Sequence, residues 1–518
     1  MDAALKINTL KNCKDWLAGL PLTNAQQAHS LLLAQLKLLN AATLDPAERL
    51  QILETLREPV AFVQGERAKR YSNQPVPLEP ATAAIWNDVI AVWFALVEGY
   101  QACAAAGVMH LALVHQRALR NIGFAMHDHN RIYRAIPTAL WQQFHKLYAA
   151  TEEAGIADTP VSDIINHDAP DPTCTSTYLH ALLAQHATPD ALTLAQLTTV
   201  ERWLKQWALL VKLTPVAGAE TPVPPLAVVL GSGSGLRNVK DLRPSPNVRY
   251  LDLGRLGAML MQMIAGLRNG KTPAELALGA EARQPACENL LVLLNKQWCS
   301  ADNGRDEERS PSSLKVLVSL TVAAMHFHLS GRAFRQPGMQ LTKREEEDLQ
   351  MFGHVSERTE KALLSQRSGA LETWEIINHN ASGFLGMCRQ PDGATRLSHN
   401  QLLGLRTATG KTFYLGIVQR LLIAENGAVS VGLRVIPGAP RPIAVRIAGA
   451  PTPDGKKYDR ALLMPEDAAR KIPASLIMAP TAFQSNRPVD LYIDAQQSAK
   501  LVSLLDKGVN FERATFAA

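Results

Sequence analysis

Two short clusters of polar residues in the second half of the chain have the residue types and spacing needed to bind an anionic ligand. The first is Arg305-Asp-Glu-Glu-Arg309, the one pair of arginines four positions apart in the sequence. Guanidinium groups bind phosphate oxygens in a bidentate way and stack on planar rings. The second is Asn378-His-Asn380-Ala-Ser382-Gly383, in which short side chains donate and accept hydrogen bonds and glycine lets the backbone come close. Taken alone, the two arginines are more simply explained by pairing with Asp306, Glu307 and Glu308, or by exposure to solvent.

The other motifs that could carry chemistry have the wrong spacing or context. In the segment 404–412, GLRTATGKT, five residues separate the two glycines, whereas a phosphate-binding loop needs four and a helix after them. We therefore interpret this segment as a hairpin turn. The segment 231–235, GSGSG, lacks the third glycine of a dinucleotide-binding turn and predicts a loop.

Two histidine pairs, His127 with His129 and His326 with His328, could chelate a metal if they lay on strands, where alternate residues share a face. No third ligand lies near either pair, so structural histidines are the better explanation. The sequence also lacks a nucleophile elbow and any local signature of a catalytic cysteine. We therefore expect no catalytic site, no metal and no cofactor.

The composition is that of an ordinary globular protein and excludes wholesale disorder. The chain has 518 residues, of which 47% are hydrophobic and 19% charged, and this length suggests about three or four domains. The net charge of +6 permits an anionic ligand but is too small to indicate a DNA- or RNA-binding surface. The six cysteines lie far apart without a CxxC pair, which predicts buried free thiols.

Neither a targeting signal nor a membrane span is expected. The N-terminal segment 1–20 carries scattered charges and lacks a long apolar region and a cleavage site. The most apolar stretch, residues 89–97, is about half the length needed to cross a bilayer and ends at Glu98. We therefore expect a cytoplasmic protein.

Residues 1–213 predict an all-α domain of helical hairpins. Apolar residues recur with the helical period after Asn24, which can act as an N-cap, as can Thr23. Asp45 places another capping residue before a proline at the first helical position. Residues 84–104 are apolar almost all round, as expected of a central buried helix. The pairing of helices suggests a distant tetratricopeptide-like array, although no constant repeat length emerges. We expect this domain to fold on its own.

The rest of the chain predicts a change from helices to strands. A Pro-rich linker, residues 214–225, separates the helical domain from a mixed α/β segment at 226–300. Residues 301–450 contain several short strands, one pair joined through Asn426-Gly427, and predict an antiparallel β-barrel with a helical insertion at 330–370. A capping box at 342–345 marks the inserted helix. The remaining residues, 451–518, predict a β/α extension that ends in a helix near 495–507.

In these respects the sequence resembles the long bacterial PilZ-domain proteins with a helical N-terminal half. The PilZ domain is a barrel that binds cyclic di-GMP through an RxxxR motif ahead of it and a [D/N]xSxxG motif at the end of an early strand. The resemblance carries the first motif onto Arg305 and Arg309. The second fits best from Asn378, with Asn380 where serine is usual and Gly383 in register. Starting from Asn380 keeps Ser382 in register but puts Leu385 at the glycine position.

The resemblance implies a receptor for cyclic di-GMP that relays this second messenger to a protein partner through its helical half. Arginine suits such a ligand because it can bridge phosphates or pair with the O6 and N7 atoms of guanine. The implied site is Arg305, Arg309, Asn378, Asn380, Ser382 and Gly383. The alternative is a degenerate PilZ-like scaffold that binds no nucleotide, which the asparagine in place of serine favours.

Overall fold

The computed structural model has two compact units, residues Met1–Gly304 and Arg305–Ala518. The structure describes residues 4–163, 165, 170–216, 226–300, 310–331, 334–337, 350–351, 371–380, 383–389, 396–407, 410, 412–447 and 458–517. The predicted capping box at 342–345 lies outside these residues, as does most of the predicted helical insertion.

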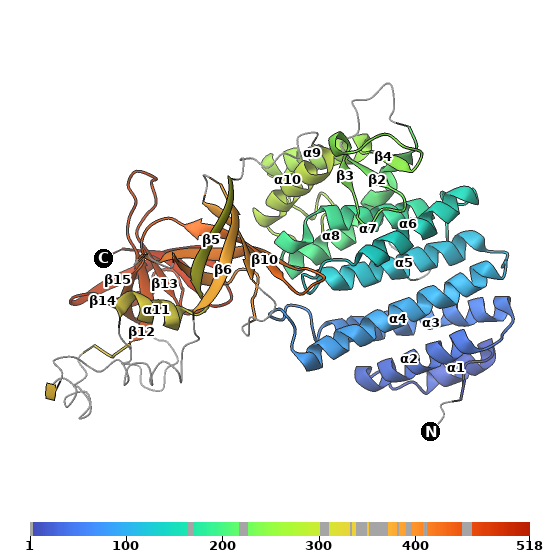
Figure 1. Ribbon diagram of the computed structural model, residues 1–518, viewed down its shortest axis with the longest axis horizontal. Coiled ribbons are helices and arrows are strands. Elements are labelled where there is room, and N and C mark those ends of the chain that lie inside the picture. The colour runs from blue at the N-terminus through green and yellow to red at the C-terminus, as the bar shows by residue number, and fades with distance from the viewer. Residues whose placement is uncertain are drawn as a thin grey trace. The chain divides into compact units, whose positions relative to one another are not determined.

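The first unit begins with long helices that lie side by side in a stack (Figure 1). Asn24 caps the second of them by accepting a hydrogen bond from the Gln27 amide. Asp45 caps the third in the same way, followed by Pro46 at the first helical position. Both predicted caps are confirmed. The helices are α1 (Leu10–Ala18), α2 (Ala25–Ala41), α3 (Pro46–Ala68), α4 (Pro80–Ala105), α5 (Leu111–Asn130), α6 (Thr138–Glu153), α7 (Cys174–His186) and α8 (Leu194–Trp207).

Helix α4 is the predicted central helix and lies among α2, α3 and α5. By length and composition alone it is apolar enough to cross a membrane, a property that core helices of soluble proteins share. Val89, Leu96 and Tyr100 on this helix are buried against its neighbours. Its apolar character is therefore explained by its place in the stack.

A single carboxylate, Glu201 on α8, joins three helices. It lies 2.9 Å from Nδ1 of His127 on α5, and it accepts a 2.7 Å hydrogen bond from Nε2 of His180 on α7. Burial raises the pKa of Glu201, but the two imidazoles outweigh this effect and hold the pKa well below its usual value. The carboxylate therefore stays charged across the physiological pH range.

Replacing Glu201 by glutamine should lower the stability of the protein at neutral pH and reduce its sensitivity to acid. A carboxyl group whose pKa is lower in the folded than in the unfolded chain contributes stability above about pH 4.3 and loses it as the pH falls through the folded-state pKa. The difference in unfolding free energy between wild type and Glu201→Gln should therefore shrink as the pH falls below about 4. Denaturant titrations at several pH values measure it, and a difference that does not vary with pH contradicts this role.

A small antiparallel sheet follows the helices, in the order β1 (Lys212–Thr214), β4 (Val248–Asp252), β2 (Leu226–Val229) and β3 (Arg237–Asn238). Strand β4 pairs with both β1 and β2, so the Pro-rich segment connects two strands of one sheet. The glycine-rich loop after β2 packs on α6, where a Cβ atom at Gly235 would lie 2.8 Å from the ring of Trp141. The predicted loop is confirmed, and close approach to α6 explains this glycine.

The hydrophobic core also crosses the Pro-rich segment. Helices α9 (Gly254–Arg268) and α10 (Ala286–Cys299) pack in one cluster with α7 and α8. Trp298 on α10 is fully buried and donates a 3.0 Å hydrogen bond to the carbonyl oxygen of Leu183 on α7. Leu204 and Trp207 on α8 belong to the same cluster. This shared core argues against independent folding of residues 1–213.

We therefore expect a chain that ends at residue 213 to be much less stable than one that ends at residue 304. The shorter chain leaves the apolar side chains of α7 and α8 exposed and deprives β1 of its partner. The longer chain keeps the whole cluster and should unfold cooperatively. Thermal denaturation followed by circular dichroism compares the two, and equal melting temperatures would refute the shared-core interpretation.

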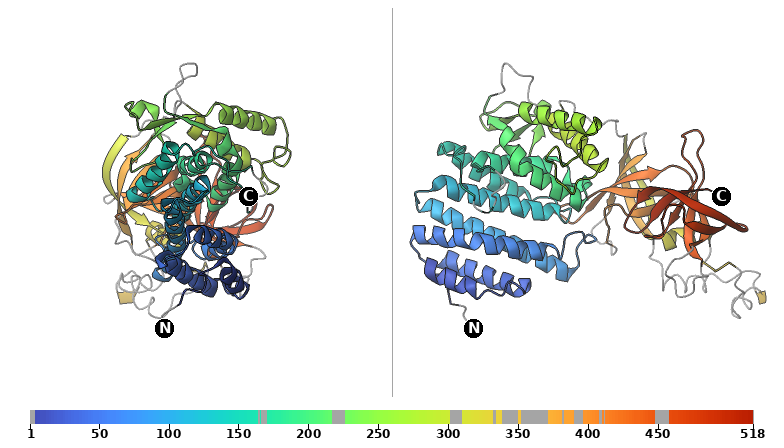
Figure 2. Two further views of the ribbon diagram at one scale, coloured as in Figure 1. Left: turned by 90° about the vertical axis from the view of Figure 1, so that its right-hand side faces the viewer. Right: turned by 180° about the vertical axis from the view of Figure 1, so that it is seen from behind.

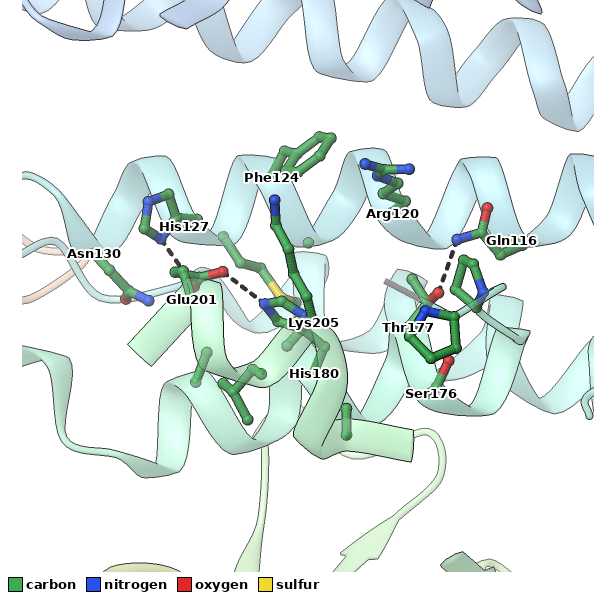
Figure 3. Close-up of a pocket in the computed structure, with 18 residues that line it drawn as sticks. Gln116, Arg120, Phe124, His127, Asn130, Ser176, Thr177, His180, Glu201 and Lys205 are labelled. Carbon is green, nitrogen blue, oxygen red and sulfur yellow. Dashed lines mark hydrogen bonds and ion pairs between the residues drawn. The ribbon is translucent and has the colours of Figure 1, made fainter. Parts of the chain in front are cut away.

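The second unit contains two closed antiparallel barrels (Figures 1 and 2). The strands of the first barrel lie in the order β10, β7, β6, β5, β8, β9. The Asn426-Gly427 hairpin joins β9 to β10 as predicted, with Gly427 at a φ of 84°. The bounds are β5 (Ser310–Ser319), β6 (Glu372–His379), β7 (Phe384–Arg389), β8 (Leu402–Thr407), β9 (Tyr414–Ile423) and β10 (Val429–Ile436).

The second barrel corrects two predictions. Residues 443–447, expected within the first barrel, belong to β11, which pairs with β12 and β14. The helix predicted near 495–507 is wrong, because Gln496–Lys507 is strand β15. Leu501, Leu504 and Leu505 have helical spacing, but pairing with β14 and β16 outweighs it. The other strands are β11 (Arg441–Ile447), β12 (Asp459–Met464), β13 (Ser475–Met478), β14 (Pro488–Tyr492) and β16 (Glu512–Ala517).

Helix α11 (Val322–Ser330) helps to join the two barrels into one unit. Its fully buried Met325 belongs to a cluster with Leu402 of the first barrel and Leu462 of the second. Asn510 adds a polar link, since its side chain accepts a hydrogen bond from the Leu402 amide and donates one to the Leu402 carbonyl oxygen. The second barrel therefore contacts the first on the side where α11 and β8 lie.

Candidate ligand-binding site

The end of β6 lies next to the start of β5. In the antiparallel pairing of these strands, Ser310 faces His379 and Pro311 faces Asn378. The chain therefore enters the first barrel at β5, beside the turn that carries the second predicted motif, which begins at Asn378. The predicted strand at 374–377, running into a polar turn, is confirmed by β6 and by the turn that follows it.

Asn378 is half-buried near the end of β6, just past the point where the register of its pairing with β7 shifts by one residue. Its side chain packs over the backbone of Gly386 on β7. A Cβ atom at Gly386 would be only 2.6 Å from Asn378 Oδ1, so a larger residue there would displace the asparagine. This contact fixes where the first residue of the motif lies relative to β7.

Gly383 forms the corner between Asn380 and β7. Its φ is 83°, which favours glycine, and its amide donates a 3.3 Å hydrogen bond to the Asn380 carbonyl oxygen. Its own carbonyl accepts a 2.9 Å hydrogen bond from the Val435 amide on β10. The backbone at Gly383 therefore requires glycine, which agrees with the register that begins at Asn378.

Replacing Gly383 by alanine should destabilise the second unit by about 1–2 kcal/mol. The added Cβ would have ordinary contact with Val435, at 3.7 Å, so the cost comes from the positive φ and not from a clash. Gly65 on α3 is a matched control, since nothing lies within 4 Å of its Cβ position, and alanine there should be neutral or slightly stabilising. Urea denaturation of both variants tests this, and equal effects would contradict it.

Three of the six predicted site residues lie outside the described part of the chain: Arg305, Arg309 and Ser382. The structure brings Asn378, Asn380 and Gly383 together on one turn. In the sequence, Arg309 is bonded directly to Ser310, the first residue of β5. Five residues of chain span at most about 18 Å, which bounds the distance from Arg305 to Ser310.

Sequence reasoning missed the neighbours that β10 supplies to this turn. Arg434 faces Phe384 in the pairing of β10 with β7, and it forms a 2.6 Å ion pair with Asp506 of the second barrel. The backbone amide of Val435 donates a hydrogen bond to the Gly383 carbonyl oxygen. The strand itself was predicted, but no local pattern shows which strand lies beside β7. Only the closure of the barrel reveals it.

The remaining motifs have structural explanations. Segment 404–412 begins in β8 and leads to its antiparallel partner β9, as the predicted hairpin requires. Both histidine pairs lie on helices, α5 and α11, and not on strands, so their members do not share a face. Within the described residues, no group of three metal-ligating side chains is arranged to hold an ion. All six cysteines are free thiols, four of them buried.

Comparison with known proteins finds matches in the N-terminal and C-terminal parts of the chain. Residues 11–218 match the family described as the N-terminal domain of the cyclic-di-GMP receptor FimW. Residues 443–518 match the FimW C-terminal β-barrel domain, which corresponds to the barrel of β11 to β16. The chain is therefore similar to FimW in both of these segments.

The similarity to a FimW receptor also extends along the chain. The cyclic-di-GMP receptor FimW of Pseudomonas aeruginosa is 23% identical over 544 residues, which cover 94% of this chain and 87% of that protein. No solved structure matches the chain. Neither FimW domain match covers the first barrel. Since the alignment with the FimW receptor covers 94% of the chain, it includes most of that barrel.

Proposed function

We propose that this protein is a receptor for cyclic di-GMP that binds the nucleotide at the β5–β6 end of the first barrel. The observation that carries the proposal is the similarity, over nearly the whole chain, to a protein named as a cyclic-di-GMP receptor. The PilZ-like motifs supply the location, since the turn at 378–383 lies beside the residue that follows Arg309.

Each part of the proposed site matches a group on the ligand. Arg305 and Arg309 bind the phosphates or the Hoogsteen edges of the guanines through bidentate hydrogen bonds. Asn380 and Ser382 contribute short donors and acceptors. Gly383 lets the ligand approach the backbone, and Asn378 acts through Gly386 to hold the turn in place. The exposed His379 lies between the two asparagines, where its imidazole can stack on a base.

The proposal extends to what the receptor does with the signal. The first unit, Met1–Gly304, which contains the stacked helices and is called the helical unit below, passes the signal to a protein partner. A receptor without catalytic activity acts by changing what it binds. We place the protein in the cytoplasm. We also propose that it returns the nucleotide unchanged, so prolonged incubation followed by chromatography should recover intact cyclic di-GMP.

The selectivity of binding tests the proposal. In isothermal titration calorimetry of the full-length protein at low salt, cyclic di-GMP should bind saturably, whereas GMP and cyclic di-AMP should bind at least about tenfold more weakly. The reason is that GMP lacks the second guanine and cyclic di-AMP lacks the O6 acceptor that arginine recognises. Equal binding of all three nucleotides would indicate a non-specific anion site. Absence of binding would favour the scaffold that binds no nucleotide.

A further inference from the structure

Arg434 on β10 points away from the interior of the first barrel and lies close to the candidate turn. Its neighbour Leu433 is fully buried, whereas Arg434 is exposed, and alternate residues of a strand point to opposite faces. The next residue, Val435, donates its amide hydrogen to the carbonyl oxygen of Gly383 at the corner of the turn. Arg434 is therefore one residue away from a hydrogen bond that fixes the turn.

The register of the strands places Asn378 on the same outer face as Arg434. Asn378 faces Gly386 on β7, and Gly386 faces Gly432 on β10. Residues that face each other across strands share a side of the sheet, and Gly432 lies two residues before Arg434. Met387, next to Gly386, is fully buried on the opposite side. Asn378 and Arg434 therefore flank one outer surface, on strands that are about 10 Å apart.

Arg434 forms an ion pair of a kind that a ligand can replace. It donates a 2.6 Å hydrogen bond to Oδ1 of Asp506 on β15 of the second barrel. Because the Arg434 side chain is 44% exposed, water reaches the pair, and such pairs contribute little to stability. A phosphate group offers the same guanidinium a bidentate, charge-assisted contact. An anion bound at the outer surface can therefore compete with Asp506 for Arg434.

Asp506 keeps a second cation when Arg434 leaves it. Its other oxygen, Oδ2, lies 3.1 Å from Nη1 of the buried Arg513 on β16. Arg513 also donates a 2.9 Å hydrogen bond to Oγ of Ser475 on β13. Since the two arginines contact different oxygens of the carboxylate, the contact with Arg513 does not depend on Arg434. Exchange at Arg434 therefore breaks an exposed ion pair and leaves the buried one intact.

We propose that Arg434 is a further ligand-binding residue of the nucleotide site, and that it exchanges Asp506 for a phosphate group of cyclic di-GMP. This inference rests on the proposed function. The nucleotide and Asp506 compete for one guanidinium, so binding removes a polar contact between the two barrels. By reciprocity, whatever strengthens the contact of Arg434 with Asp506 weakens nucleotide binding.

Two single variants should change the affinity in opposite directions in isothermal titration calorimetry of the full-length protein with cyclic di-GMP at low salt. Arg434→Ala removes a phosphate contact and should weaken binding about tenfold. Asp506→Asn removes the competing charge and should tighten binding about two- to fivefold. Its amide oxygen can still accept the hydrogen bond from Arg513. A pair with a purely structural role would shift both affinities in the same direction or leave both unchanged.

A double variant and a matched ion pair complete the test. Arg434→Ala combined with Asp506→Asn should bind as Arg434→Ala does, because Asp506 affects the site only through Arg434. Arg446 and Asp490 form a comparable 2.5 Å, partly exposed pair within the second barrel. Arg446→Ala and Asp490→Asn should therefore leave the affinity unchanged. Thermal denaturation of the same preparations shows whether each variant is folded.

The outcomes separate this inference from the proposed function. Absence of binding by wild type would overturn the proposed function and this inference with it. Binding by wild type that is unchanged in Arg434→Ala would overturn the inference alone. Weaker or equal binding by an Asp506→Asn variant that melts as wild type does would also overturn it. If Asp506→Asn does not fold, Arg434→Ala alone decides.

Discussion

Replacing both Arg305 and Arg309 by alanine should weaken cyclic di-GMP binding by about a hundredfold or more. Each replacement removes a charge-assisted contact worth on the order of 1.5–3 kcal/mol, which corresponds to about ten- to a hundredfold in affinity for each single variant. Both residues precede the first strand of the barrel, so the melting temperature should stay close to that of wild type. Calorimetry and thermal denaturation of the same preparations measure the two effects.

Salt and a control arginine separate specific contacts from general attraction. Raising the ionic strength should weaken wild-type binding, because unlike charges are screened, and should affect the double variant much less. Arg470 in the second barrel is a suitable control. Its side chain is 67% exposed and pairs only with nearby Asp467 among the ion pairs of the described residues, so Arg470→Ala should bind the nucleotide as wild type does. A double variant that retains wild-type affinity would make the two arginines ordinary surface residues.

The largest loss of stability is expected from Glu372→Ala, which leaves a buried cation without its partner. Arg389 on β7 is 2% exposed and donates two hydrogen bonds to Glu372 on β6, of 2.7 and 2.8 Å. The Trp374 indole donates a third, of 2.9 Å. Breaking a buried ion pair from one side costs about 3–5 kcal/mol. We expect about 3 kcal/mol, because the Glu372 side chain is 19% exposed and water can partly replace it.

Tryptophan fluorescence offers a direct measurement of this loss, since Trp374 is the one tryptophan of the second unit in the sequence. Its emission should shift in urea at a lower denaturant concentration in Glu372→Ala than in wild type. Arg434→Ala provides the control. The Arg434–Asp506 pair has an arginine that is 44% exposed, so its loss should cost less than about 1 kcal/mol. A Glu372→Ala variant no less stable than Arg434→Ala would contradict the assigned role of the buried pair.

Local patterns in the sequence predicted much of the fold. Helix starts at Asn24 and Asp45, the apolar helix α4 and the hairpin at Asn426-Gly427 each follow from a few neighbouring residues, whose preferences the tertiary structure reinforces. It was therefore possible to predict the helical N-terminal half, the mixed α/β middle segment and the antiparallel barrel. The turn at Gly383 was predictable for the same reason, because a positive φ favours glycine and the sequence has a glycine at this position.

Features that depend on long-range pairing were not predictable from local patterns. Residues 495–507 have helical spacing of leucines, yet two neighbouring strands determine their structure. The assignment of residues 443–447 to the second barrel depends on pairing with β14, more than forty residues later in the chain. The core that joins α7 and α8 to α10 likewise spans the Pro-rich segment. The neighbours that β10 supplies to the candidate site, Arg434 and the backbone amide of Val435, were missed for the same reason.

Mapping the bound nucleotide by photocrosslinking tests the central claim most directly. A photoreactive cyclic di-GMP analogue is incubated with the full-length protein and irradiated, and the modified peptides are identified by mass spectrometry after digestion. We predict crosslinks within residues 305–311 and 378–386, the segments that meet where β5 begins and β6 ends, and we expect excess unlabelled cyclic di-GMP to abolish them. Competed crosslinks confined to the helical unit or to the second barrel, or no competed crosslink at all, would contradict a nucleotide site on the first barrel.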